Sequence, residues 1–274
     1  RVEYIRIIVA ELNRIASHLL YVATIGLDAG AMTPSMFAFR GRERIQSLFE
    51  AVSGARMMHN YFRIGGIKEE LPDNFRQLIG ELLPLLRVDV EQSDKILTFN
   101  EIFLSRLKDV AAISAEEAID FGLTGPCLRG CGVEYDVRKA QPYSVYDRFD
   151  FDVPVGLDGD CWDRHWVRVQ EMYQSLAIVE QALEQMPEGT VTSSLGRRLI
   201  RPPEGEVYVR SENPRGEIGV HLVSDGTDHP YRIKVRPPSF CNLSALKLLL
   251  RDSWLADSVV ILGSLDIVLG EVDR

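Results

Sequence analysis

Apolar residues recur at helical spacing through the first 25 positions of the chain, and this pattern limits the possible folds more than any other feature. Apolar side chains recur there at intervals of three and four residues, which places them on one face of an α-helix. The residues concerned are Ile5, Ile8, Val9, Leu12, Ile15, Leu19 and Val22. Such a face must be buried against other elements. The sequence therefore predicts a packed amphipathic helix over 2–25, ended by Gly26 and Gly30.

Helical patterns dominate the rest of the chain. Thr33-Pro34 has the order of a helix cap followed by a first-turn proline, and Ser114-Ala-Glu-Glu117 is a capping box. We expect helices over 34–62, 71–97, from 115 onward, 162–186, 243–250 and 254–262. Alternation of apolar and polar residues predicts an antiparallel meander, with strands over 206–211, 217–224 and 231–236. The expected class is mainly α with a small antiparallel sheet (α+β).

Composition divides the chain into four parts. Residues 1–186 are expected to form a helix-bundle core, which includes an irregular segment rich in Gly, Pro, Tyr and Asp at 122–159. Irregular segments of this length are usually functional or packed against a partner. The remaining parts are a short basic linker over 187–205, the β meander over 206–237, and C-terminal helices with a buried tail over 238–274.

Charge and hydropathy argue against two classes of protein. The 274 residues include 31 basic and 40 acidic side chains, hence a net charge of −9. Since no basic block stands out, nucleic acid is not expected as a partner. The longest apolar stretch, residues 5–27, is interrupted by Arg6, Glu11, Arg14 and His18, so it does not predict a membrane span. Any membrane association is expected to require a partner.

The four cysteines do not predict a metal site. Cys127 and Cys131 are four positions apart, and neither Cys161 nor Cys241 supplies a matching pair with ligand spacing. We therefore expect reduced thiols and no bound metal.

The last 13 residues are unusual for the end of a chain. Chain ends are commonly polar and frayed, whereas 262–274 sets apolar residues beside two acids, Asp266 and Glu271. An apolar end predicts burial, and buried acids must be paired, protonated or exposed to a cavity. A final strand with surface acids is the simpler interpretation, and a site that uses both acids is the alternative.

Several further segments together carry a resemblance to a known family. They are Glu11-Leu-Asn-Arg14, Gly26-Leu-Asp-Ala-Gly-Ala-Met-Thr-Pro34, Arg40-x-Arg-Glu43, Arg56-Met-Met-His-Asn-Tyr-x-Arg-Ile-Gly-Gly66 and Gly270-Glu-Val-Asp-Arg274. With these segments the chain closely resembles, over its whole length, the hydrogenase-large-subunit-like, quinone-site subunit of the proton-pumping NADH:quinone oxidoreductases, respiratory complex I. The resemblance implies a nickel–iron hydrogenase large-subunit-like helix bundle, of which this chain is about the C-terminal two thirds.

The same resemblance implies which residues face the quinone. The family's quinone-holding His and Tyr lie in the N-terminal third, which has no counterpart here. Asp28 matches the aspartate that neighbours that histidine, and it is the candidate catalytic residue. Leu20 and Thr24 lie two turns and one turn earlier on the same helical face and match positions that line the quinone cavity. Met36 matches a wall position that is often aromatic. From the residues alone, Asp28 would be a structural acid at a helix end and Leu20 and Met36 core residues.

The tail adds Asp266, Val268 and Glu271 to the candidate quinone-binding set. Nickel–iron hydrogenase large subunits end in Asp-x-Cys-x-x-Cys, and Val268 and Glu271 stand where the two metal-binding thiolates would be. Valine has no lone pair for a metal, so a soft-metal centre cannot be rebuilt. The resemblance thus implies that the former metal cavity takes a flat, hydrophobic quinone head group.

The implied function is that of the quinone-site subunit of NADH:quinone oxidoreductase. The chain would form the ubiquinone or menaquinone pocket with the iron–sulfur subunit that carries the terminal cluster, and would couple quinone reduction to proton translocation. It would bind no cofactor itself, because NADH and the iron–sulfur clusters belong to partner subunits, and the isolated chain would be inactive. Other peripheral-arm subunits and a membrane-arm subunit at the quinone entrance are the further expected partners. The expected location is peripheral, on the cytoplasmic side of the bacterial inner membrane or the matrix or stromal side in an organelle.

Three alternatives remain open. A related quinone-linked complex that receives electrons from ferredoxin or another donor would use the same kind of subunit. No feature of this chain indicates which electron donor is used. A nickel–iron hydrogenase is disfavoured by the absent terminal cysteine pair. A purely structural scaffold is supported only by the missing N-terminal part.

Overall fold

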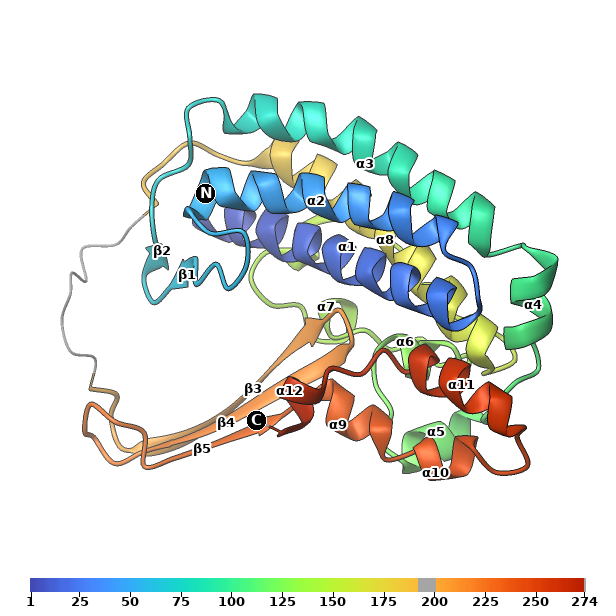
Figure 1. The fold of residues 1–274 in the computed structure, drawn as a ribbon. Coiled ribbons are helices and arrows are strands. Elements are labelled where there is room, and N and C mark those ends of the chain that lie inside the picture. The colour runs from blue at the N-terminus through green and yellow to red at the C-terminus, as the bar shows by residue number, and fades with distance from the viewer. Residues whose placement is uncertain (192–200, 274) are drawn as a thin grey trace.

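Four long helices form the body of the molecule. The computed structural model describes residues 1–191 and 201–273. Within it the helices run alongside one another in a bundle (Figure 1): α1 (Val2–Asp28), α2 (Thr33–Ser53), α3 (Phe75–Leu97) and α8 (Cys161–Gln185). Two small antiparallel sheets accompany them. The expected α+β class is therefore confirmed.

Helix α1 is the central element of the bundle. It packs against both α2 and α8, and its apolar stripe from Ile5 to Ile25 is almost entirely buried. The predicted end at residue 25 is too early, since the helix continues through Gly26 to Asp28. The carbonyl of Gly26 accepts a hydrogen bond from Ala31 N at 2.7 Å, which closes the end of the helix. Gly30, with a φ of +89°, makes the turn into α2.

Helix α2 is shorter than the sequence predicts. It ends at Ser53 and not near residue 62, because Gly54 takes a left-handed conformation with a φ of +74° and donates its N–H to Glu50 O at 2.8 Å. This is a common way for a helix to end. Beyond it, β1 (Phe62–Arg63) pairs with β2 (Gly66–Ile67). Phe62, near which the helix was predicted to end, is 45 % exposed in β1.

The connection between α3 and α8 is built from short elements. Helix α4 (Glu101–Leu107) is capped by Asn100, and α5 (Ala115–Asp120) begins with the predicted capping box of Ser114 and Glu117. The irregular segment 122–159 then contains α6 (Pro126–Arg129), α7 (Val137–Ala140) and the 3₁₀ turn η1 (Tyr146–Arg148). Much of this segment is buried beneath the bundle. It therefore contributes to the interior of this chain.

The predicted meander is present as a three-stranded sheet that projects from the bundle (Figure 1). Its strands β3 (Gly205–Asn213), β4 (Gly216–Ser224) and β5 (Arg232–Arg236) pair in that order and antiparallel. The register places Val207, Leu222 and Ile233 side by side on one face. About half of the predicted linker 187–205, residues 192–200, lies outside the described residues.

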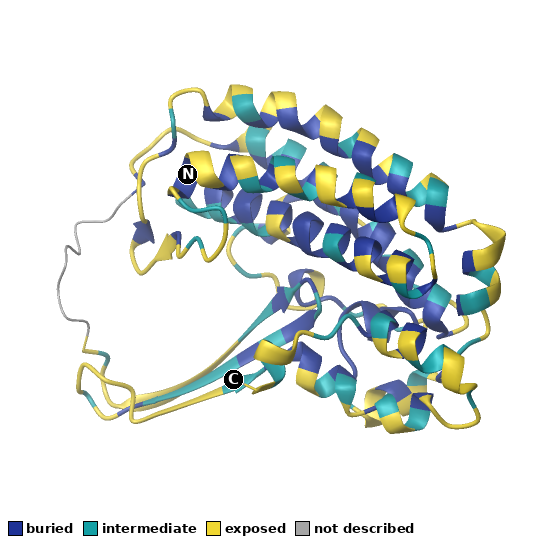
Figure 2. Ribbon diagram, in the orientation of Figure 1, coloured by how far each residue is buried: buried dark blue, intermediate teal, exposed yellow. Residues whose placement is uncertain are grey.

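The C-terminal part consists of short helices, more broken than the two that the sequence predicts. They are α9 (Pro238–Leu243), α10 (Leu246–Leu249), the 3₁₀ turn η2 (Leu255–Asp257), α11 (Ser258–Ser264) and α12 (Leu269–Asp273). The expectation of a buried tail is only partly correct. Leu265 is fully buried, but Val268 is 39 % and Leu269 65 % exposed. The chain turns outward there because Asp266 has a left-handed φ of +53° (Figure 2).

The β3–β4 turn packs closely against the segment before α6, and the contact is made by two glycines. Gly125 and Gly216 have φ angles of +63° and +130°, which favour glycine. A Cβ on Gly125 would lie 2.3 Å from Gly216 Cα, and one on Gly216 would lie 2.6 Å from Thr124 Cγ2. Because a backbone atom cannot move aside as a flexible side chain can, only glycine permits this contact. The hairpin is thereby fixed against the underside of the bundle.

We expect Gly125→Ala to destabilise the chain far more than Gly54→Ala. Both positions have a left-handed backbone, which costs an alanine roughly 1–2 kcal/mol. Position 54 has open space around its Cβ direction, whereas overpacking at position 125 should add about 1–3 kcal/mol. Urea unfolding of the two variants measures the difference. Equal free energies of unfolding would show that the hairpin contact is not tight.

Candidate functional site

A cavity of about 480 Å³ opens at the end of α1, between that helix and the C-terminal helices. Three of the candidate site residues line it: Thr24, Asp28 and Asp266. The rest of the wall is mostly apolar and comes from α10, α11 and the segments beside them: Leu246, Leu250, Ser258, Val259, Leu262, Gly263 and Ile267. The fold thus brings the last turns of the first helix together with a residue near the end of the chain.

Asp28 lies at the last position of α1 and faces α11. A Cβ on Gly263 would lie 2.6 Å from its Oδ2 atom, so the glycine leaves the space that this carboxylate occupies. Partial burial raises the pKa of Asp28 above its ordinary value. Thr24, one turn earlier, donates its hydroxyl to Tyr21 O at 3.0 Å. The cavity therefore has a carboxyl group with a raised proton affinity beside a hydroxyl tied to its own helix.

Asp266 also lines this cavity and is held by an arginine that the sequence did not single out. Arg215, in the β3–β4 turn, donates Nε to Asp266 O at 2.7 Å and Nη2 to Oδ1 at 3.1 Å. Arg168 Nε lies 4.0 Å from the other carboxylate oxygen. Asp266 is therefore a carboxylate between two guanidinium groups.

The other four candidate residues lie away from this cavity wall. Leu20 is half-buried on α1, and Met36 is 60 % exposed on α2. In the tail, Val268 N donates to Ser239 Oγ at 3.3 Å, and Glu271 accepts from Ser239 N at 3.2 Å and from its hydroxyl. Ser239 thus turns both tail residues towards α9. For these four the role in quinone binding stays a prediction.

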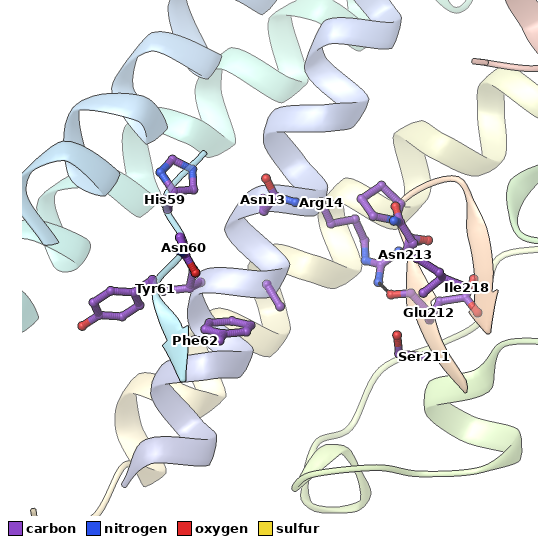
Figure 3. A pocket seen from close by; sticks show the side chains of 13 residues that line it. Asn13, Arg14, His59, Asn60, Tyr61, Phe62, Ser211, Glu212, Asn213 and Ile218 are labelled. Atoms are coloured by element: carbon purple, nitrogen blue, oxygen red, sulfur yellow. Dashed lines mark hydrogen bonds between the residues drawn. The ribbon is translucent and has the colours of Figure 1, made fainter. Parts of the chain in front are cut away.

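A second cavity, of about 440 Å³, contains none of the candidate residues. It lies between α1, the loop before β1 and the base of the β3–β4 hairpin (Figure 3). Its wall includes Asn13 and Arg14 from α1, Tyr61 and Phe62 from the loop and β1, and Ile218 from β4. Arg14 points across it and donates to Glu212 O at 2.9 Å. This cavity adjoins the hairpin and not the end of α1.

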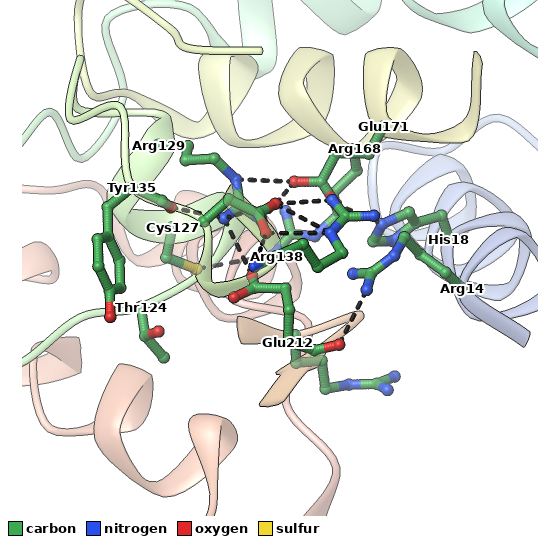
Figure 4. A network of polar contacts seen from close by, with 12 residues as sticks. Arg14, His18, Thr124, Cys127, Arg129, Tyr135, Arg138, Arg168, Glu171 and Glu212 are labelled. Atoms are coloured by element: carbon green, nitrogen blue, oxygen red, sulfur yellow. Dashed lines mark hydrogen bonds and ion pairs between the residues drawn. The ribbon is translucent and has the colours of Figure 1, made fainter. Parts of the chain in front are cut away.

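A cluster of buried charges lies in the interior of the molecule (Figure 4), and two of its members, Arg14 and Glu212, also line the second cavity. It joins α1, α6, α7, α8 and the end of β3, and its members are at most 6 % exposed. They are Glu11, Arg14, His18, Arg129, Asp136, Arg138, Glu171 and Glu212. Its central contacts run from His18 Nε2 to Glu171 Oε2, at 2.8 Å, and from Arg129 Nε to Glu171 Oε1, at 2.9 Å. Removal of one partner from such a cluster typically costs about 3–5 kcal/mol, because the other charge is left buried.

The carboxyl groups of Glu11 and Glu212, at two ends of this cluster, have different pKa values. Burial by itself would raise the pKa of Glu11, but Arg14 and Arg138, with two hydroxyl donors, lower it to about 2. At Glu212, burial outweighs the attraction of Arg129 and raises the pKa to about 7. Charge balance explains the difference, since the four carboxylates of the cluster face only three guanidinium groups, those of Arg14, Arg129 and Arg138. Glu212 is therefore the carboxylate of the cluster whose pKa burial raises.

The sequence contained a signal for this cluster. Glu11, Arg14 and His18 recur at helical spacing within the apolar residues of α1, whereas charged residues on helices usually lie on the solvated face. Glu171 lies among the buried residues of α8 in the same way. Charges on a buried face predict partners across the core. The identity of those partners, Arg129 and Arg138 above all, depends on contacts between segments far apart in the chain.

The cysteines do not gather into a ligand set. Cys127, Cys131 and Cys161 are buried and Cys241 is half-buried. Cys127 Sγ lies 3.6 Å from Arg168 Nη2, and burial raises the pKa of Cys131 to about 11. Within residues 1–191 and 201–273, no three His, Cys, Asp or Glu side chains are placed to hold a metal ion. In the same part of the chain no helix is both long and apolar enough to cross a bilayer.

Comparison with known proteins finds relatives of this chain over its whole length. The family model of the respiratory-chain NADH dehydrogenase 49-kDa subunit matches residues 28–199 and 194–274. All 274 residues align at 49 % identity with an NADH-quinone oxidoreductase subunit from Solibacter usitatus, covering 74 % of that protein. The NADH-quinone oxidoreductase subunits matched in Bacillus anthracis and in Chlorobaculum tepidum are each 50 % identical, with 75 % and 70 % of their lengths covered.

These matches extend over the whole chain and define its family. The chain belongs to the family of the 49-kDa subunit of NADH-quinone oxidoreductase, the enzyme of respiratory complex I. The hydrogenase-like helix bundle expected from the sequence is the fold of this family.

The raised pKa of Glu212 predicts a specific dependence of stability on pH. The folded chain holds a proton at Glu212 up to about pH 7, whereas the unfolded chain releases it near 4.5. The contribution of this group to stability is therefore fully present below pH 4.5 and is lost as the pH rises through 7. Because glutamine cannot ionise, Glu212→Gln should gain free energy of unfolding relative to the wild type across this window.

Urea unfolding from pH 5 to pH 8 measures this gain. Glu206→Gln is the matched control, because Glu206 lies on the same strand with its side chain 73 % exposed. A constant difference between Glu212→Gln and the wild type at all pH values would contradict proton retention by Glu212.

Proposed function

We propose that this chain forms one wall of the quinone-reducing site of an NADH-quinone oxidoreductase, against a neighbouring iron–sulfur subunit. The observation that carries this proposal is the single cavity that Thr24, Asp28 and Asp266 line together. Its volume of about 480 Å³ lies within the range of roughly 300–1,000 Å³ that small-molecule sites occupy. Membership of the 49-kDa subunit family supports quinone as the ligand.

The chemistry of the wall fits a quinone head group. A quinone is flat and mostly apolar, with oxygens that need hydrogen bonds and, on reduction, protons. Leu246, Leu250, Val259 and Leu262 provide apolar surface, and Asp28 provides a carboxyl group whose pKa burial has raised. Such a group can give or retain a proton when the charge of a bound quinone changes. In this proposal Asp28 is the catalytic residue, and Asp266 is the second acid of the wall.

The cluster of buried charges supports a role in proton coupling. Asp266 contacts the cavity on one side and Arg215 and Arg168 on the other. Arg168 lies one turn of α8 from Glu171, which belongs to the buried cluster. A change of charge at the quinone would therefore act on buried groups in a medium that screens it little. We propose that this arrangement links quinone reduction to proton translocation.

The remaining parts of the reaction would come from partner subunits. Electrons would pass from NADH through iron–sulfur clusters held by neighbouring subunits, and this chain would bind quinone and no cofactor. The C-terminal helices bear exposed apolar side chains, Trp254 and Leu255, which are 82 % and 89 % exposed. Exposed apolar patches are typical of protein interfaces. They support contact with other subunits. We propose that these include a membrane-arm subunit, that the complex lies on the cytoplasmic side of the membrane, and that the isolated chain has no turnover.

Asp28→Asn tests the proposed site. The change is nearly isosteric and removes the charge, so the fold should persist while NADH:quinone turnover in membranes falls. We expect a graded loss, at or below about 100-fold, the lower end of what a general acid contributes. An artificial electron acceptor that bypasses the quinone site should be reduced at the wild-type rate.

The control for this variant is Asp120→Asn, at the exposed end of α5. It should leave both rates unchanged. If Asp28→Asn lowers quinone turnover and artificial-acceptor turnover together, Asp28 is a structural residue and the cavity is not the quinone site.

A further inference from the structure

We propose that Arg215 is a positioning residue that holds the carboxylate of Asp266 at the cavity wall, in competition with the buried Arg168. The inference rests on the proposed function, because it concerns the wall of the proposed quinone site. Neither arginine was among the candidate residues. Three observations support it. Arg215 donates hydrogen bonds to Asp266, and Arg168 lies close to Asp266 without a hydrogen bond to it. The turn that contains Arg215 is held in place by contacts with other segments.

Arg215 binds Asp266 at two points and α1 at a third. Its Nε donates to Asp266 O at 2.7 Å, its Nη2 to Asp266 Oδ1 at 3.1 Å, and its Nη1 to Ser17 Oγ at 3.1 Å. The planar guanidinium fixes these directions relative to one another. Since both the backbone and the side chain of Asp266 are held, the arginine determines where that carboxylate points.

The backbone of Asp266 needs such a restraint. Its φ of +53° lies in the left-handed region, which residues other than glycine rarely adopt. This conformation turns the tail outward after Leu265 and leaves Asp266 in the wall of the cavity that Thr24 and Asp28 also line. The hydrogen bond from Arg215 to the carbonyl of Asp266 holds the turn directly. The position of the carboxylate is thus coupled to a residue 51 positions earlier.

Arg168 offers the same carboxylate a second partner. Its side chain is fully buried, it donates Nη1 to Arg164 O at 2.8 Å, and its guanidinium lies 4.3 Å from the centre of the Tyr21 ring. Among the described residues, neither Arg168 Nε nor Asp266 Oδ2 has a hydrogen-bond partner, and the two atoms are 4.0 Å apart. A buried donor and a buried acceptor at that separation attract each other strongly. Arg215 is the group that keeps them apart.

The turn that contains Arg215 is fixed by its contacts and cannot move together with the carboxylate of Asp266. Gly216 is in contact with Gly125 and Thr124, and Asn242 Nδ2 donates to Arg215 O at 3.2 Å. Asn242 Oδ1 in turn accepts from Thr124 N at 2.9 Å. Two segments, 124–125 and the one that contains Asn242, therefore fix the base of the arginine side chain. When the guanidinium is removed, the turn stays in place and only the carboxylate is released.

The consequence is a carboxylate with two positions. With Arg215 in place, Oδ1 of Asp266 is held by the arginine and the residue lies in the cavity wall. Without Arg215, rotation of the side chain brings Oδ2 into hydrogen-bonding distance of Arg168 Nε and withdraws the charge from the quinone wall. The site keeps its apolar surface and Asp28 but loses the second acid.

The test uses the assembled complex in membranes and a short-chain, water-soluble quinone as substrate. Arg215→Ala should lower kcat/KM for this quinone about tenfold, while the amount of complex and the artificial-acceptor rate stay at wild-type values. Arg215→Lys should recover part of the loss, because an ammonium group reaches the carboxylate but cannot also hold the carbonyl. Arg210→Ala is the matched control: this arginine lies in the same strand pair and bonds to Glu217 and Gln141, and its loss should leave quinone kinetics unchanged.

The structure of the Arg215→Ala complex provides a direct second measurement. We expect Asp266 Oδ2 within hydrogen-bonding distance of Arg168 Nε, and the turn at 213–216 unmoved. An Asp266 carboxylate that keeps its wild-type position in that variant would overturn the proposal. So would a loss of assembled complex with normal quinone turnover per complex, or a lysine variant no better than alanine.

Asp266→Asn separates this proposal from the proposed function. If Asp266→Asn changes quinone kinetics and Arg215→Ala does not, the positioning role of Arg215 is wrong and the cavity remains the quinone site. If neither variant changes quinone kinetics, Asp266 does not act on the quinone, and the assignment of this cavity fails with the inference.

Discussion

The pairing of Glu171 with His18 and Arg129 is the interaction on which the rest of the structure depends. It ties α8 to α1 through His18 and to the segment before α7 through Arg129. Arg129 then reaches Glu212 at the base of the hairpin. Because these groups are buried, each charge must be compensated within the cluster. The bundle, the irregular segment and the sheet are therefore held in one arrangement by electrostatic balance as well as by apolar packing.

Helix α1 links this cluster to the cavity. Its middle supplies Glu11, Arg14 and His18 to the charges, and its end supplies Thr24 and Asp28 to the proposed quinone wall. A helix is stiff over such a distance, so the cluster fixes the position of the cavity residues. The β3–β4 hairpin makes the same connection from the other side, since Glu212 belongs to the cluster and Arg215 holds Asp266.

The predicted element boundaries are wrong where a single backbone conformation, which the periodicity of the side chains does not reveal, ends or redirects an element. The predicted extension of α2 to residue 62 is wrong because Gly54 takes a left-handed conformation and the helix ends at Ser53. The tail was expected to be buried on its composition, but the φ of Asp266 directs Val268 and Leu269 outward. In both places a single backbone conformation outweighed the pattern of side chains. The meander and the capping box at Ser114 were predicted correctly because strand alternation and helix capping are local.

The sequence by itself determined the class of fold, the long helices, the meander and the family, because these depend on spacing along the chain and on short motifs. It also placed Thr24 and Asp28 on one helical face, since helix geometry relates positions four apart. By contrast, the cavity that Asp266 shares with them, the raised pKa of Glu212, and the position of Arg215 and Arg168 on either side of one carboxylate became apparent only in the folded chain. Each of these depends on distances between segments far apart in the chain and on how completely a charge is removed from water, and neither quantity is set by local sequence.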